Sequence, residues 1–455
     1  MTNISTPTGR QASIERTRRV RDGLRRRHLH EALFKGFGLA AIIAALGFVA
    51  ILFTDVLIKG IPAFTQANLH LEATFDPAII DVGPAPVRTA GQSDADFRAA
   101  SLGWQRDVAL LNWNKVVEAS LRAAAPAGFE IDSRQILTVA ETNARHVLRE
   151  MFVNDPSLLG QTIKVDLLAS ANADNWVKGN IDRELGDAQQ QLSAPARALI
   201  DIFEENGTIS MGFAWSIFTN VDSRAAPASA GLAGAFMGSL FMMVIVILLA
   251  VPIGVASAIY LEEFAPKSRL TDLIEVNINN LAAVPSIVFG LLGAAVFINY
   301  FKLPLSAPLA GGLVLTLMTL PTIIIATRGA LQGVSPALRQ AALGMGASKT
   351  QMVFHHVLPV TFPSILTATI IGVAQALGET APLLLIGMNA FVASIPATPL
   401  DQATALPVQI YLWQANENRN FFEARTSAAI LVLLGFMILL NAIAILLRTR
   451  LERRA

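Results

Sequence analysis

Long apolar runs alternate with polar segments along this 455-residue chain. A helix needs about 20 apolar residues to cross the roughly 30 Å of hydrocarbon in a bilayer. Residues 36–58 form one such run near the N-terminus, and five more follow residue 230: 231–261, 272–300, 309–327, 362–388 and 427–447. This pattern predicts an all-α membrane protein with about six transmembrane helices.

Residues 59–230 interrupt the pattern, because charges are frequent there and no apolar run could cross a bilayer. Apolar residues at helical spacing predict one helix over 133–152 and another over 196–205, while 163–168 favours a short strand. The segment is long enough for a domain of its own. We therefore expect a mostly helical soluble insert between the first and second spans, with Trp104, Trp113 and Trp176 as core or interface residues.

The basic residues orient the predicted spans. Residues 1–35 carry a run of arginines, which could suggest a nucleic-acid-binding arm, but the adjoining apolar run favours a membrane flank. That run exceeds the roughly 7–15 residues of a signal-peptide core, so it reads as an uncleaved span. Because basic flanks stay in the cytoplasm, six spans place segment 1–35, loop 328–360 and tail 448–455 inside. The insert 59–230 then lies outside the membrane.

The amino-acid composition narrows the possible class of protein further. Hydrophobic residues make up 53% of the chain and charged residues 15%, against about 25% charged in soluble proteins. The sequence has no cysteine, which excludes disulfides, thiolate catalysis and zinc–thiolate sites. The net charge of +1 is uninformative by itself.

The loop 328–360 reads as a compact helix–turn–helix lobe. Ser335 and Pro336 suit the start of a helix, and Gly344 and Gly346 suit its end. Ser348 can cap a second helix, which we expect to last until Leu358-Pro359. The small residues Ala341 and Ala342 suit close approach by another protein, so the lobe is interpreted as a docking surface rather than an ordinary amphipathic connector.

The residues of this lobe resemble a known pattern. Gln340-Ala341-Ala342, then Gly346, then His356-Val357-Leu358-Pro359 is similar to the cytoplasmic loop of ABC-importer permeases, which carries Glu-Ala-Ala, a Gly and Ile-x-Leu-Pro at the same offsets. Gln340 replaces the acid and His356 the isoleucine. The resemblance implies that an ATPase docks here, through the following residues: Arg339, Gln340, Ala341, Ala342, Gly346, Leu358 and Pro359.

The fifth apolar run contains an ionisable residue, Glu379. Such a group at the centre of a span costs at least about 3 kcal/mol and is a functional candidate by default; a structural carboxylate paired with a neighbouring helix is the alternative. With Gln375 and Thr380 it is our candidate for the translocation pathway. Pro252, Pro285 and Pro321 lie inside predicted spans and suggest kinked or broken helices, whether for a cavity or for packing alone.

Three further stretches sharpen the resemblance. Gly-Glu-Thr-Ala-Pro-Leu at 378–383, Val-Pro-Ser-Ile-Val-Phe-Gly at 284–290 and Ile-Tyr-Leu-Glu-Glu at 259–263 are similar to the phosphate-specific ABC importer's permease subunit of the PstA type. Family members can carry an arginine four residues before this glutamate, where this chain has Gln375. The likeness covers about 231–450 and the first span, not the insert or the long basic N-terminus.

This resemblance implies one half of a pore in a bacterial inner membrane. The expected partners are a homologous permease (PstC type), a dimer of ATPase subunits (PstB type), an extracytoplasmic phosphate-binding protein (PstS type), inorganic phosphate and membrane lipid, with no nucleic acid. The chain itself would catalyse no covalent step. A permease for another oxyanion, such as sulfate or molybdate, is the alternative within the class, and a membrane sensor with a ligand-binding insert is the rival outside it.

Two other motifs suggest a phosphate-binding loop and a metal site but do not meet the requirements of either. Gly346–Thr350 ends in Lys-Thr as a phosphate-binding loop does, but Ser348 and Leu343 stand where that loop needs glycine. His355 and His356 are adjacent and therefore point to different helix faces, and no third ligand is near in sequence. We accordingly expect neither a nucleotide cofactor nor a metal on this chain.

Overall fold

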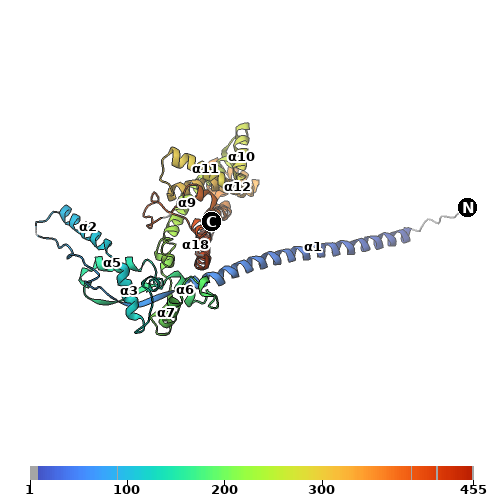
Figure 1. The fold of residues 1–455 in the computed structure, drawn as a ribbon. Coiled ribbons are helices and arrows are strands. Elements are labelled where there is room, and N and C mark those ends of the chain that lie inside the picture. Colours follow the sequence, from blue (N-terminus) through green and yellow to red (C-terminus); the bar gives the residue numbers. More distant parts are fainter. Residues whose placement is uncertain (1–8, 90, 391, 417–418, 453–455) are drawn as a thin grey trace. The chain divides into compact units, whose positions relative to one another are not determined.

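The computed structural model describes residues 9–452, apart from 90, 391 and 417–418 (Figure 1). Residues 1–8 of the predicted N-terminal segment and 453–455 of the predicted tail lie outside the described residues. The chain divides into two units, Met1–Ile58 and Lys59–Ala455. Helix α1 (Gly9–Gly60) fills the described part of the first unit and ends just inside the second. Residues 9–35 of the basic segment and the first apolar run are thus one continuous helix.

The insert has a three-stranded antiparallel sheet among its described residues, in the order β2-β1-β3. The strands are β1 (Thr65–Thr74), β2 (Thr162–Leu168) and β3 (Ile209–Phe213). In β1, Leu69, Leu71 and Ala73 are buried while His70 and Glu72 are exposed, the alternation of a half-buried strand. Sequence reasoning found only β2, although the alternating apolar positions of β1 carried the signal.

Helices and 3₁₀ turns surround this sheet. They are η1 (Ile61–Phe64), α2 (Asp94–Leu110), α3 (Trp113–Ala124), α4 (Ser133–Ile136), α5 (Ala144–Asn154), η2 (Pro156–Leu158), α6 (Ala171–Val177), η3 (Asp187–Gln189), α7 (Ala194–Glu205), α8 (Ser216–Thr219) and η4 (Pro227–Ser229). Trp113, Phe152 and Phe75 pack together in the core of the insert, which confirms Trp113 as a core residue. The helix predicted over 196–205 is confirmed by α7.

The single helix predicted over 133–152 is wrong. Two helices, α4 and α5, occupy this stretch, and Ala140 between them pairs with Ala169 as a β-bridge. The amide of Glu141 also donates to the carbonyl of Leu168 at 2.9 Å. Backbone pairing with the end of β2 therefore replaces the helical hydrogen bonds there, although the apolar spacing is helical throughout.

The membrane part of the chain contains both long apolar helices and short helical segments. They are α9 (Ala233–Ile259), α10 (Arg269–Ala282), α11 (Ser286–Gly293), α12 (Pro308–Gln332), α15 (Leu358–Gly378), α16 (Ala381–Leu385), α17 (Leu406–Gln414) and α18 (Arg419–Glu452). Helix α12 is central, because it packs on both α9 and α15. At Gly312 a Cβ would lie 2.8 Å from the side chain of Ile245, so only glycine allows this approach of α12 to α9.

Among the described residues, five helices are long and apolar enough to cross a membrane, or six if one bent pair counts as a span. The five are Arg27–Phe64, Ala233–Phe264, Pro308–Gln332, Lys349–Gly378 and Phe421–Arg450. The bent pair corrects the predicted span 272–300, because α10 and the segment Ser286–Tyr300 meet at 101°. Pro285 is the residue before α11, as the predicted break at this proline requires, while Pro252 and Pro321 lie inside continuous helices.

Candidate functional site

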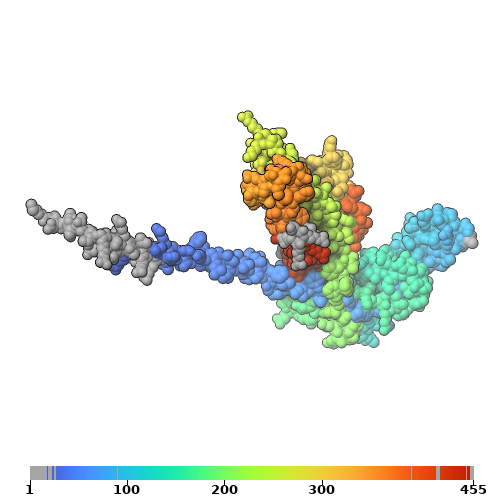
Figure 2. Space-filling view, turned by 180° about the vertical axis from the view of Figure 1, so that it is seen from behind, coloured from blue at the N-terminus to red at the C-terminus, as the bar shows by residue number. Residues whose placement is uncertain are grey.

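The lobe after α12 contains a short helix, α13 (Pro336–Gly344), and Figure 2 shows this region, in orange, as a rounded projection. The hydroxyl of Ser335 accepts a hydrogen bond from the amide of Ala337 and caps the helix. Gly346 then adopts φ +88°, a left-handed conformation that favours glycine. The sequence-predicted start and turn of the lobe are thus confirmed.

The second helix of the lobe begins as predicted but does not end there. Ser348 caps α14 (Lys349–Met352) in a capping box with Gln351. A π-helical turn, η7 (Val353–Val357), then leads straight into α15, which starts at Leu358. Pro359 thus lies inside one helical segment, Lys349–Gly378, directly after its π-helical turn. The expected stop at Leu358-Pro359 is therefore wrong, and the lobe is continuous with a membrane helix.

Some of the predicted docking residues are exposed on the lobe, and one is buried inside it. Gln340, Ala341 and Gly346 are exposed, whereas Ala342 is 2% exposed and packs in a small core with Val334 and Val353. The small size of Ala342 thus serves packing within the chain. Two apolar side chains that sequence reasoning did not single out, Leu343 and Met345, stand out from the lobe with 46% and 78% exposure.

Arg339 ties the lobe to the end of α9. Its guanidinium donates to Glu263 Oε1, at 2.7 Å from Nη2 and 3.1 Å from Nε, and to the carbonyls of Leu331 and Val334. Glu263 is 8% exposed and belongs to the π-helical turn η5 (Tyr260–Phe264). A buried carboxylate held by two donors of one arginine fixes both elements.

A second arginine makes a similar connection one element away. Arg328, near the end of α12, donates to Glu275 of α10 at 2.8 Å and lies 3.4 Å from Glu262 of η5. Gln332 also donates to Glu262, at 2.9 Å. The stretch Ile-Tyr-Leu-Glu-Glu at 259–263 therefore supplies two of the three acids, and Glu275 of α10 the third, in contacts that join α9, α10, α12 and the lobe. No local feature of the sequence indicates these pairings, since their members lie 53 to 76 residues apart.

The other candidate site lies where the fifth predicted span breaks. Helix α15 ends at Gly378, Glu379 is extended with ψ 124°, and the short helix α16 begins at Ala381. The expectation that Glu379 lies mid-helix in a span over 362–388 is therefore wrong. Pro382 explains the break, because proline suits a helix start and not a helix interior.

Glu379 is half-buried at this break, Thr380 is also half-buried, and Gln375 is exposed one turn earlier on α15. Within the described part of the chain, no hydrogen bond or ion pair involves the Glu379 carboxylate. The alternative of a structural carboxylate paired inside this chain thus finds no partner there. A carboxylate in such a place is chemically available to a cation from outside the chain.

The break packs directly against the other broken helix. At Gly290 of α11, a Cβ would lie 2.7 Å from Cα and 2.8 Å from the carbonyl oxygen of Pro382 in α16. The stretches 284–290 and 378–383, almost a hundred residues apart, therefore meet through a glycine and a proline. Two interrupted helices side by side leave backbone carbonyls that a cavity or a protein must satisfy.

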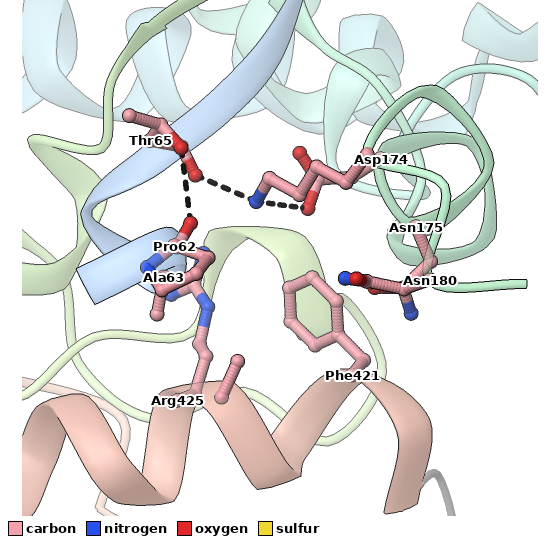
Figure 3. A pocket seen from close by; sticks show the side chains of 10 residues that line it. Pro62, Ala63, Thr65, Asp174, Asn175, Asn180, Phe421 and Arg425 are labelled. Carbon is pink, nitrogen blue, oxygen red and sulfur yellow. Dashed lines mark hydrogen bonds and ion pairs between the residues drawn. The ribbon is translucent and has the colours of Figure 1, made fainter. Parts of the chain in front are cut away.

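Sequence reasoning missed one buried charge, Arg425, in the first turns of α18. Arg425 is 2% exposed, and its guanidinium donates to the carbonyl of Ala228 at 2.8 Å and also to that of Ala230. Figure 3 shows the side chain rising from α18 toward the end of η1, beside Phe421. A charge at the start of a span is expected to be exposed, but here distant parts of the chain, including segment 227–230 and η1, cover it.

The peptide group of Ala228 connects Arg425 to the insert. Its N–H donates to Glu141 Oε2 at 2.7 Å, and its carbonyl also accepts from Gln66 Nε2 at 2.5 Å. Burial raises the pKa of Glu141, and hydrogen bonds from the amides of Thr142 and Ala228 and the charge of Arg425 offset part of that rise. The insert and the last span are thus joined by buried polar contacts.

An ion pair within the insert lies beside these contacts between the insert and α18. Lys178 donates to Asp174 Oδ2 at 2.6 Å and to the carbonyl of Thr65 at 2.7 Å (Figure 3). Asp174 is 1% exposed and also accepts from the amide of Ala67 at 2.8 Å. The start of β1, helix α6 and α18 therefore line one small polar cavity.

Comparison with known proteins divides the sequence into two parts. Residues 250–455 match the family described as binding-protein-dependent transport system inner membrane component, and residues 21–187 match a domain of unknown function, DUF3333. The chain is 31% identical to the phosphate transport system permease protein PstA of Haemophilus influenzae, over 46% of this chain and 73% of that protein.

Two further similarities lie in the same class. The chain is 31% identical to the probable ABC transporter permease protein YqgI of Bacillus subtilis over 39% of this chain, and spans 60% of the length of that relative. The structure resembles a solved structure of the MetNI methionine ABC transporter with a TM-score of 0.39 and 17% identity, over 48% of this chain and 95% of that one.

Proposed function

We propose that this chain, which belongs to the family of binding-protein-dependent transport system inner membrane components, forms half of the pore of an ATP-driven phosphate importer. The observation that carries the proposal is the contact between stretches 284–290 and 378–383, with Glu379 half-buried and unpaired within the described chain at the break. The name of the Haemophilus influenzae relative supports phosphate as the substrate.

Coupling to ATP hydrolysis takes place at the lobe. The exposed residues Gln340, Ala341, Leu343 and Met345 offer a partly apolar tip that a separate ATPase subunit can cover. Arg339 transmits movement of that tip, because its pairing with buried Glu263 ties the lobe to α9. The continuity of the lobe with α15 supports a second route from the lobe to the break at Glu379.

Glu379 sets the position and strength of a cation contributed by the partner permease. A lone carboxylate facing the path would repel a phosphate dianion, whereas a carboxylate paired with an arginine orients that arginine toward phosphate. Gln375, exposed on the preceding turn, adds a neutral hydrogen-bond donor on the same face. Thr380, next to the break, is the third residue of this proposed pathway.

The complete transporter contains a homologous permease (PstC type), two ATPase subunits (PstB type) and an extracytoplasmic phosphate-binding protein (PstS type). The chain is a multi-pass membrane protein, and we place both termini and the lobe in the cytoplasm of a bacterium with the insert outside its inner membrane. The basic flanks of the spans support this orientation.

The test is co-expression of this chain with the neighbouring transporter genes, followed by purification and an ATPase assay. Stimulation of ATP hydrolysis by a phosphate-loaded binding protein would support the proposal. Stimulation by a sulfate- or molybdate-loaded binding protein instead would replace phosphate by another oxyanion. Failure of the chain to capture any ATPase subunit would favour the rival, a membrane sensor.

A further inference from the structure

Four aromatic side chains gather at one corner of the insert. Phe64 ends η1, Phe213 ends β3, and Trp215 and Phe218 belong to the turn and short helix that follow. The ring centroids of Phe64 and Phe218 are 6.0 Å apart, those of Phe213 and Trp215 are 4.8 Å apart, and those of Phe213 and Phe218 are 6.1 Å apart. We refer to these four residues as the aromatic face.

Three rings of the aromatic face are exposed, and the fourth, Phe64, is half-buried against the hydrophobic core. Trp215 is 67% exposed, Phe213 49% and Phe218 43%, whereas Trp113 and Trp176 in the core of the insert are 4% and 5% exposed. The described residues offer no hydrogen-bond acceptor to the indole N–H of Trp215, while the indole of Trp113 donates to the carbonyl of Val108. A contiguous exposed patch of this kind marks an interaction surface.

The position of the aromatic face relative to the spans indicates its partner. Phe64 is the last residue of the candidate span Arg27–Phe64. Strand register then sets Phe213 opposite Thr65, the residue directly after Phe64. The aromatic face therefore begins at the end of the first candidate span. Pairing of β3 with β1 brings Phe213, and α8 after it, back beside that end.

The returning chain reaches the same place. The amide of Leu232 donates to the carbonyl of Ile217 at 2.7 Å, and α9, the next candidate span, starts at the following residue, Ala233. Since Ile217 lies between Trp215 and Phe218 in sequence, the aromatic face adjoins both ends of the insert. In the chain, the aromatic face thus adjoins the end of one candidate span and the start of the next.

We propose that the aromatic face lies in the headgroup layer of the bilayer on the side of the insert, in contact with phospholipid. Tryptophan is enriched at this depth because its ring is apolar and its N–H is polar. Phenylalanine rings beside it bury apolar area that is otherwise in water. The contact holds the corner of the insert that carries the aromatic face at the membrane surface. It thereby restricts rotation of the insert about the two segments that join it to the spans.

The absence of cysteine from the sequence allows single spin labels to test the proposal. We would label Trp215→Cys and, as a matched control, Val87→Cys, an 82% exposed residue between β1 and α2. The full-length protein would be assembled with its partner subunits in phosphatidylethanolamine–phosphatidylglycerol vesicles. Collision rates with oxygen, which concentrates in lipid, and with a water-soluble nickel chelate would be measured by electron paramagnetic resonance.

A lipid contact predicts that the ratio of oxygen to nickel collisions at position 215 exceeds that at position 87. Equal ratios, with high nickel access at both positions, would overturn the proposal, because the aromatic face would then face water. Protection of position 215 from both reagents would overturn it as well, since another protein would then cover the face.

A second measurement uses the native side chain and does not require the cysteine variant to fold. Phospholipids brominated near the headgroup end of their chains should quench part of the tryptophan emission, and Trp215→Phe should remove that quenched part. Because Phe keeps an aromatic ring in the face, this variant is expected to fold. Equal fractional quenching in the wild type and in Trp215→Phe would contradict contact with lipid.

Discussion

Replacing Arg425 by methionine tests whether the insert is held to the last span by buried hydrogen bonds. Methionine keeps most of the length of the arginine side chain and removes its donors and its charge. The carbonyl of Ala228 keeps the hydrogen bond from Gln66, whereas that of Ala230 loses its bond to the guanidinium. The junction between 227–230 and α18 should therefore open more often.

The size of the effect follows from the two lost hydrogen bonds. Each hydrogen bond from a charged donor contributes roughly 1.5–3 kcal/mol. Removing a buried cation also recovers part of its desolvation penalty. We therefore expect the free energy of opening the contact between segment 227–230 and α18 to fall by about 2–4 kcal/mol. Since about 1.4 kcal/mol corresponds to a factor of ten, the open population should rise roughly 30-fold to several hundred-fold. Arg425→Lys keeps the charge and one of the two hydrogen bonds to carbonyl oxygens, and it should lose about half as much free energy.

Limited proteolysis by thermolysin measures this population, because cleavage tracks the open form when opening and closing are fast. The reading is the cleavage rate within residues 214–232 of the purified full-length protein in detergent. Arg98→Met is the matched control, since Arg98 is exposed on α2 and surface changes there cost less than about 0.5 kcal/mol. Equal cleavage rates for Arg425→Met and the control would show that the Arg425 hydrogen bonds do not hold the insert to α18.

Glu141 gives the same junction a pH dependence. Burial raises its pKa above the usual 4.5, so the folded insert binds this proton more tightly than the unfolded chain. Its contribution to the free energy of unfolding is therefore largest below pH 4.5 and falls as pH rises through the folded pKa. Glu141→Gln should remove this fall, and Arg425→Met should extend it to higher pH, in thermal unfolding measured across pH 4–8.

Three further outcomes are expected. Glu379→Gln should assemble normally yet lose phosphate uptake, while Glu379→Asp keeps some; wild-type uptake per assembled complex in the glutamine variant would end that assignment. Gly346→Val should strain the turn by about 1–2 kcal/mol and reduce co-purification of the ATPase, unlike Gly344→Ala, and equal capture by both would count against the lobe. Ala95→Cys should react with an impermeant maleimide in intact spheroplasts and Ala341→Cys only after lysis; the reverse would invert the topology.

Helix starts and breaks that depend on neighbouring residues could be predicted from the sequence. Ser348 and Gln351 form the capping box that a serine before a helix suggests, and Pro285 marks a real break. Gly378 and Pro382 also carried the signal for the break at Glu379, but the apolar run around them outweighed it. Hydrophobicity shows that a segment enters the membrane and does not show whether its helix is continuous.

Long-range pairings were not predictable. Glu263 pairs with Arg339 and Arg425 bonds to Ala228 across 76 and 197 residues, and neither partner carries a local mark of the other. For the same reason Ala342 was interpreted as facing a partner protein, although Val334 and Val353 enclose it. A small residue on a helix favours close packing without saying which neighbour is close.

Uptake of phosphate into proteoliposomes shows whether this chain forms half of a phosphate-importing pore. The vesicles would contain this chain with the homologous permease and the ATPase subunits, ATP on the side of the ATPase, and the binding protein with radiolabelled phosphate on the other. We expect phosphate to accumulate only when ATP and the binding protein are both present, and accumulation to be lost in Glu379→Gln. Absence of phosphate accumulation by an assembled complex that hydrolyses ATP, or accumulation of sulfate or molybdate in its place, would show that this chain does not form a phosphate pore.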